Sequence, residues 1–209
     1  MIKKLYRNLV LLIVISILCI GTLPIVNAAD ANGNTPTISH ASPEQLELIN
    51  KLWGSDITIG EYMEKVHPEH LVDVPDEVKK DMYLRKMNWP DENTATAESG
   101  STDTRQTLRA TLQVIGDLTI YWNHINFWST ATLQGADRAS YIYVESFLKN
   151  SADSTVGSTS GSNTNTNSVA CSNNVAWPAA GYYHVHSWGY TTSPDTEGSH
   201  HSSAQYFSG

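Results

Sequence analysis

Two histidines separated by one residue are the strongest candidates for chemistry in this 209-residue chain. In the motif YYHVHSWGY, His184 and His186 fall two positions apart. Alternate side chains share one face of a β-strand, so the two imidazoles would project side by side, and imidazole pairs suit Zn²⁺ or Cu²⁺. We expect His200 as a third ligand, with His201 and His124 as alternatives. The competing interpretation is a half-exposed strand with alternating polar residues.

A second group of ligand types occurs in the motif His67-Pro68-Glu69-His70. The zinc motif HExxH places both histidines on one face of a helix. Here the proline interrupts the helix, so the sequence predicts a polar helix end followed by a turn.

Nucleophilic catalysis has little support in the sequence. Cys171 is the only cysteine after residue 28, which leaves no intramolecular disulfide there, and a reactive thiolate needs an electropositive setting. No Lys or Arg follows Lys149, and the motif GxSxG does not occur. We therefore expect no catalytic residue and no cofactor, with Cys171 as a buried apolar side chain or an intermolecular thiol.

Aromatic residues are frequent in the second half of the chain. On strands, some of them must face outward, and exposed Tyr and Trp beside Asn, Ser and Thr contact proteins or glycans. The alternative is pairing between aromatic side chains on neighbouring strands. The aromatic residues concerned are Tyr121, Trp122, Phe127, Trp128, Tyr141, Tyr143, Trp177, Tyr182, Tyr183, Trp188 and Tyr190.

Residues 1–28 are typical of a cleavable signal peptide. Basic residues precede an apolar run from Leu9 to Ile20, and a small-residue exit ends at Ala28. The apolar run meets Pro24 before the roughly 20 residues that a membrane-spanning helix needs. We therefore expect a secreted or envelope-associated protein with no membrane span after cleavage.

The charge balance argues against polyanionic partners. The formal net charge is −8, and cleavage would remove three of the 13 basic residues and none of the 21 acidic ones. Binding to nucleic acid depends largely on Lys and Arg, so we expect no nucleic-acid partner. An envelope or extracellular protein, or a glycan, fits this composition better.

The chain divides into an N-terminal helical part and a β-rich part. After a flexible leader at 29–42, capping signals at Ser42 and Thr58 and the start signal at Pro75 predict three short helices within 43–90. Residues 91–104 contain no large apolar side chain and are predicted to be a linker.

From residue 105 onward, hydrophobic periodicity changes from 3.6 to 2. The fold class that we expect is mainly β, an antiparallel β-sandwich of six to seven strands over 105–209, preceded by the three-helix module. Along 141–148, Glu145 interrupts a row of aromatic residues, which predicts a partly exposed face. Residues 151–168 are nearly all Ser, Thr, Asn and Gly and are predicted to be a long loop.

Two segments resemble known proteins. The stretch TIGEYMEKV, with PEHL and NWP after it, resembles a helical module in uncharacterised exported proteins of methanogenic archaea. The stretch AGYYHVHSW resembles a strand in small secreted β-sandwich proteins of archaea and Gram-positive bacteria, where Arg often replaces one histidine. A more distant likeness is to the lactococcin 972-like bacteriocins. The resemblance implies a secreted β-sandwich and carries over no catalytic residue.

Three hypotheses for function follow. The leading one is an exported, non-enzymatic envelope or extracellular protein that serves as a surface interaction or structural module. The second is a metal-binding protein or metal-dependent enzyme that uses His184 and His186. The third is a secreted bacteriocin-like antagonistic protein whose helical part is a removable pro-segment.

Overall fold

The computed structural model describes residues 35–72, 74–90 and 110–209. The predicted signal peptide, the predicted linker and the first part of the predicted leader lie outside these ranges. Within them the protein is mainly β, with antiparallel strands in two sheets. The nine strands of the described residues are β1 (Thr37–His40), β2 (Thr111–Ile120), β3 (His124–Gln134), β4 (Ala139–Asn150), β5 (Thr155–Thr166), β6 (Ser168–Ala176), β7 (Gly181–Thr192), β8 (Thr196–His201) and β9 (Gln205–Phe207).

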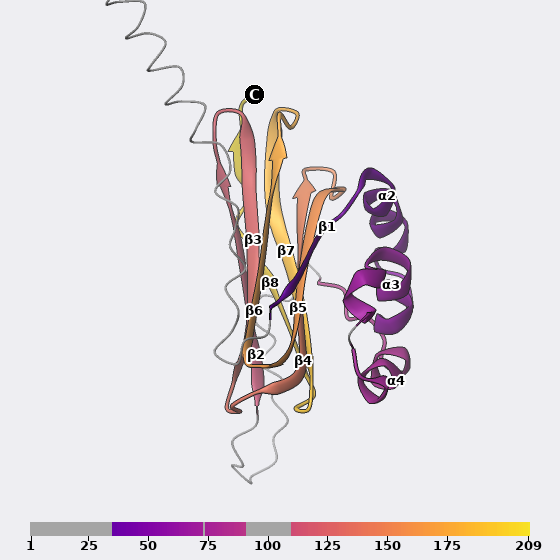
Figure 1. Cartoon of the computed structure of the whole chain (residues 1–209). Coiled ribbons are helices and arrows are strands. Elements are labelled where there is room, and N and C mark those ends of the chain that lie inside the picture. The colour runs from indigo at the N-terminus through magenta and orange to yellow at the C-terminus, as the bar shows by residue number, and fades with distance from the viewer. Residues whose placement is uncertain (1–34, 73, 91–109) are drawn as a thin grey trace, which may run out of the picture.

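The two sheets form two layers, seen edge-on in Figure 1. The larger sheet has the strand order β1-β5-β4-β7-β8, with β9 also paired to β7, and the smaller sheet has the order β2-β3-β6. In β2, buried and exposed residues alternate, as expected for a strand with one face inward. Between the layers lie the buried side chains of Leu112, Val114, Ala131, Ile142, Val144, Phe127, Leu148 and Val185.

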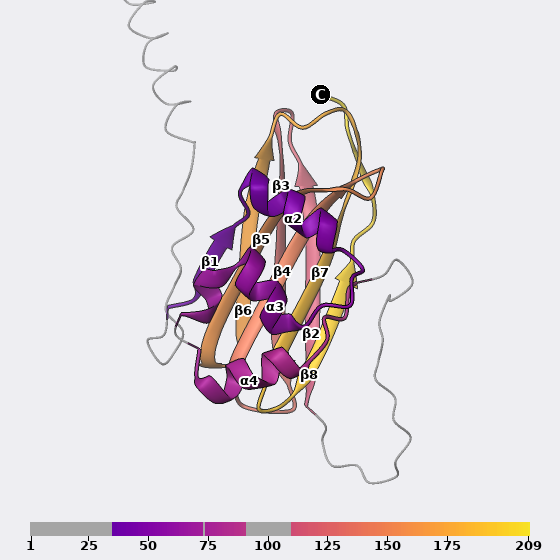
Figure 2. The same ribbon diagram turned by 90° about the vertical axis from the view of Figure 1, so that its right-hand side faces the viewer.

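Three α-helices and one 3₁₀ turn cover the outer face of the larger sheet, as Figure 2 shows. They are α2 (Pro43–Leu52), α3 (Ile59–Val66), the 3₁₀ turn η1 (Pro68–Leu71) and α4 (Asp76–Leu84). The predicted capping boxes at Ser42 and Thr58 are confirmed, because each side chain accepts from the backbone of the third helical residue. In the described part of the chain, no helix is long and apolar enough to cross a membrane.

The helices and the sheet share one apolar core. Side chains of α2, α3 and α4 pack directly on the aromatic row of β4 and β7, which buries both faces of the larger sheet. The predicted partial exposure of that row is therefore wrong, because the helices replace solvent over it. The shared core includes Ile49, Tyr62, Met63, Met82, Trp89, Tyr141, Tyr143, Phe147, Trp188 and Tyr190.

Two segments predicted to be irregular are strands. The predicted loop at 151–168 contains β5, which pairs with β4 along most of its length. Small residues suit this position because β5 packs closely on the other sheet: a Cβ at Gly161 would lie 2.9 Å from the carbonyl oxygen of Ala170. The predicted leader contributes β1, which pairs with β5 at the sheet edge. These additions take the strand number above the predicted six to seven.

Candidate metal centre

Three histidines of neighbouring strands meet on the helix-covered side of the larger sheet. His186 of β7 lies opposite His201 of β8 in the strand register, and His184 precedes it by two residues on the same face. The ring centroids are 4.3 Å apart for His186 and His201, and 4.9 Å apart for each pair that includes His184. One nitrogen from each ring lies within 4.8 Å of the other two.

The orientation of His186 suits a metal ligand. Its side chain is buried, and its Nδ1 lies 3.1 Å from the carbonyl oxygen of Pro90. A carbonyl only accepts, so Nδ1 carries the proton and Nε2 keeps its lone pair. Among the described residues, this Nε2 has no hydrogen-bond partner. A backbone carbonyl that fixes the tautomer in this way is the usual outer partner of a metal-bound histidine.

The pKa of His186 also favours the ligand form. Burial lowers this pKa to about 3, and the neighbouring imidazole of His201 acts in the same direction. The ring is therefore neutral at physiological pH, as metal binding requires.

A carboxylate lies near His184, one of the three histidines. Asp153, in the turn between β4 and β5, places Oδ1 3.8 Å from Nε2 of His184 and 3.1 Å from Nζ of the buried Lys149. The ammonium of Lys149 lies 3.4 Å from the ring centroid of Trp53. Asp153 balances the charge of Lys149, but it does not belong to the group of ligand atoms that lie within 4.8 Å of one another, which consists of the three histidines.

The predicted third ligand, His200, is not part of this group. Neighbouring residues of a strand point to opposite faces, so the side chain of His200 points into the space between the two sheets. There its Nδ1 accepts a hydrogen bond from the backbone NH of Gly116 at 3.3 Å. His201 takes the predicted position. His124, the other alternative, lies on β3 in the smaller sheet and stacks on Tyr121.

The motif at 67–70 is a helix end followed by a turn, as predicted, and its two histidines are buried. His67 is the C-terminal cap of α3, and the 3₁₀ turn that follows carries His70 inward, while Glu69 stays partly exposed. Ligand atoms of the three residues lie within 4.8 Å of one another. Both nitrogens of His70 already bond to hydroxyls, at 2.7 Å to Ser162 and 2.8 Å to Ser160. This group is a hydrogen-bond network, whereas His184, His186 and His201 form the better candidate for a metal site.

The network continues to Glu145, for which the sequence predicted a partly exposed face. Its carboxylate is fully buried and accepts from Tyr62, Tyr143 and Ser158, and His67 Nε2 lies 3.0 Å from Oε1. A buried carboxylate needs such partners. In the sequence, the only sign that Glu145 is buried is its position as a lone acidic residue among aromatic ones. Its partners on α3 and β5 are distant from it in the chain.

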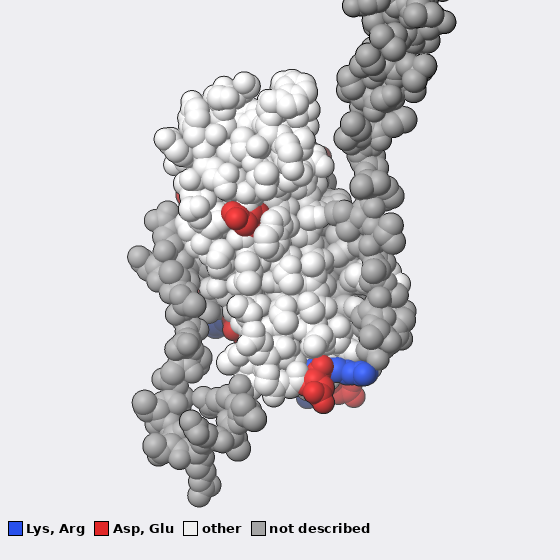
Figure 3. Space-filling model, turned by 90° about the vertical axis from the view of Figure 1, so that its left-hand side faces the viewer, with Lys and Arg blue, Asp and Glu red and all other residues white. Residues whose placement is uncertain are grey.

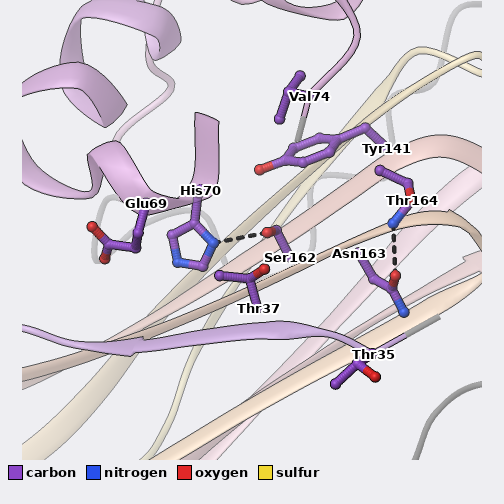
Figure 4. A pocket seen from close by; sticks show the side chains of 9 residues that line it. All are labelled: Thr35, Thr37, Glu69, His70, Val74, Tyr141, Ser162, Asn163 and Thr164. Carbon is purple, nitrogen blue, oxygen red and sulfur yellow. Dashed lines mark hydrogen bonds between the residues drawn. The ribbon is translucent and has the colours of Figure 1, made fainter. Parts of the chain in front are cut away.

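A small cavity of about 150 Å³ opens beside the same network, shown in Figure 4. Glu69 and His70 lie on one side of it and Tyr141 on the other, and one of the two dashed lines in the figure joins His70 to Ser162. The His–Ser pair resembles part of a hydrolytic triad, but the other nitrogen of His70 faces the Ser160 hydroxyl rather than a carboxylate. Burial lowers the pKa of His70 to about 4, with the charge of His67 acting in the same direction, which makes it a weak base.

Cys171 points between the two sheets. Its side chain is buried, and its Sγ lies 3.3 Å from the carbonyl oxygen of Thr159. Burial raises the pKa of the thiol well above its usual range, and this favours the unreactive protonated form.

The fold and the site together define a class: a mainly β protein with two packed antiparallel sheets, a helical cover and a three-histidine cluster beneath it. No model of a known protein family matches the chain. No curated protein matches it either. Function is therefore argued from the site itself.

Proposed function

We propose that this chain is an exported metal-binding protein of the envelope or extracellular space, in which His184, His186 and His201 hold one Zn²⁺ or Cu²⁺ ion. The role proposed is binding or structural rather than catalytic. Export is inferred from the basic start and apolar run within residues 1–28.

The observation that carries the proposal is the fixed tautomer of His186. Its protonated Nδ1 faces the Pro90 carbonyl and its Nε2 belongs to a group of three imidazole nitrogens within 4.8 Å of one another. Nitrogens bound to one tetrahedral zinc at about 2.0–2.1 Å lie about 3.3 Å apart. Small side-chain rotations of His184 and His201 would bring the three nitrogens to that spacing.

The ligand chemistry selects the ion. Three imidazoles suit Zn²⁺ and Cu²⁺. A site made only of carboxylate and carbonyl oxygens would instead suit Ca²⁺ or Mg²⁺. We therefore expect Zn²⁺ to compete well against a large excess of Mg²⁺.

Calorimetric titration of the metal-free protein with Zn²⁺ tests the proposal. Wild type should bind about one ion per chain. His186→Ala and His201→Ala should each weaken binding at least about tenfold, because even mutation of a residue that only hydrogen-bonds to a metal ligand lowers metal affinity by about 10–100-fold. His124→Ala and His200→Ala are the matched controls and should bind as wild type does. Circular dichroism would confirm that each variant is folded.

Two results would refute the site. One is zinc affinity that is unchanged in folded His186→Ala. The other is a wild type that binds neither Zn²⁺ nor Cu²⁺.

A further inference from the structure

We call the outward face of the smaller sheet the platform. In uninterrupted register, residues 111–120 of β2 pair with residues 125–134 of β3, and residues 124–132 of β3 pair with residues 168–176 of β6. In the described part of the chain, the helices lie on the far side of the other sheet (Figure 1). The outward side chains of these strands are exposed or partly exposed.

Large aromatic side chains line this platform and its end. Trp128 projects outward from the middle of β3, and Trp122 and Trp177 meet at the adjoining end with ring centroids 5.3 Å apart. These last two indoles are 75% and 66% exposed. The backbone NH of Trp177 donates to the carbonyl oxygen of Asn123 at 2.8 Å, which ties the two loops together. The backbone of the two loops that carry these rings is therefore joined before any partner arrives, which lowers the entropic cost of ordering the loops on binding.

Amide and hydroxyl groups accompany the rings. One cross-strand row of the platform consists of Thr119, Asn126 and Asn174, and the next row consists of Asp117, Trp128 and Ser172. Amide side chains both donate and accept hydrogen bonds, and hydroxyls do the same. The platform thus offers flat apolar rings next to groups that can bond to hydroxyls.

Charge is almost lacking on the three strands. Asp117 is the only Asp, Glu, Lys or Arg in β2, β3 and β6. Where no grey atoms cover it, Figure 3 shows this face as largely uncharged, with one acidic spot in its upper half, a small charged spot at its left edge and a mixed group of charges at its lower end. A partner that depends on phosphate or carboxylate groups would find no counter-charge here.

We propose that this platform binds a neutral polysaccharide. Sugar rings present apolar C–H faces that stack on Trp128, Trp122 and Trp177, and equatorial hydroxyls bond to Asn126, Asn174 and Thr119. A lipid surface fits less well, because rows of amides and hydroxyls would have to leave water without partners. The platform lies on the opposite side of the molecule from the three-histidine site, so the proposal is independent of metal binding.

Native gel retardation in soluble neutral polysaccharides (hydroxyethylcellulose, glucomannan and dextran), with pull-down on insoluble chitin, tests this proposal on the full chain. At least one of these probes should bind wild type. Trp128→Ala and the double variant Trp122→Ala/Trp177→Ala should each bind it about tenfold or more weakly, as loss of a stacked ring predicts.

The matched control is the double variant Tyr182→Ala/Tyr206→Ala. This pair is also exposed, with ring centroids 5.0 Å apart, but it belongs to β7 and β9 of the larger sheet. It should retain wild-type binding. Binding to none of the neutral probes, equal binding by the tryptophan variants, or preferential binding to alginate or to phosphatidylcholine vesicles would overturn the proposal.

Discussion

The carboxylate of Glu145 on β4 and the imidazole of His67 at the end of α3 form an ion pair from which solvent is fully excluded. Oε1 and Nε2 are 3.0 Å apart, and both side chains have zero exposure. The pair joins the helical segment to the larger sheet. Tyr62 of α3 donates to the same carboxylate, so two residues of the helical segment depend on one residue of the sheet.

Replacing Glu145 by Gln should destabilise the fold strongly. The change leaves His67 buried without its counter-charge, and breaking a buried pair from one side costs about 3–5 kcal/mol. Urea unfolding followed by circular dichroism measures the loss. Glu47→Gln, on the exposed side of α2, is the control and should change the free energy of unfolding by less than about 0.5 kcal/mol. Equal stability of the two variants would contradict the role given to Glu145.

The same pair predicts a loss of stability at alkaline pH. Burial alone would lower the pKa of His67, but the charge of Glu145 and its hydrogen bond raise it to about 9. The folded pKa is above the unfolded value of about 6.5, so the stabilisation is complete below that pH and is lost as pH rises to about 9. Urea unfolding at pH 6.5, 7.5 and 9 should show a steady decrease in wild type. In Glu145→Gln that decrease should largely disappear.

On the acid side, His70 acts in the opposite direction. Its pKa is lowered to about 4, chiefly by burial, so below pH 6.5 the unfolded chain takes up a proton that the folded chain does not. Stability should therefore fall between pH 6.5 and 4 as well, which places the maximum near pH 6.5. Urea unfolding at pH 6.5, 5 and 4 measures this, and a free energy of unfolding that stays constant or rises as the pH falls from 6.5 to 4 would refute the role given to His70.

The sequence predicted the local structure better than the long-range contacts. Capping residues at Ser42 and Thr58 and the alternation of Ile142 and Val144 against Tyr141 and Tyr143 are local patterns, and each is confirmed. The buried state of Glu145 depends on partners 78 and 83 residues away, which no local pattern reveals.

The candidate metal site shows the same limit. The shared face of His184 and His186 follows from strand periodicity alone. The choice of His201 over His200 depends on the register of β8 against β7, and a shift by one residue would reverse it. Strand β5 was missed because its Ser, Thr, Asn and Gly residues are typical of loops, while their small size is what close packing of the sheets requires.

Close packing between the sheets is tested at Gly116. A Cβ at this position would lie 2.0 Å from Oγ of Ser187 and 2.6 Å from Oγ of Ser129, two hydroxyls that bond to each other. Gly116→Ala should therefore cost about 1–3 kcal/mol through overpacking. Gly181→Ala is the matched control, because an added Cβ there meets nothing within 4 Å. Thermal unfolding of the two variants compares them, and an equal melting temperature would argue against tight contact at Gly116.

Cys171 should be unreactive in the folded protein. Because its thiol is buried and its pKa is raised, iodoacetamide at pH 8 should leave it unmodified, and labelling should become complete in urea. Mass spectrometry of the Cys171 peptide measures this. Rapid labelling of the native protein would show that the space between the sheets is open to solvent.

X-ray absorption at the zinc edge tests the central claim most directly. The zinc-loaded protein should give a first shell of nitrogen and oxygen at about 2.0–2.1 Å, with outer-shell scattering from three imidazoles, and His201→Ala should reduce that number. A first shell of oxygen only, without imidazole scattering, would contradict a zinc site built from His184, His186 and His201.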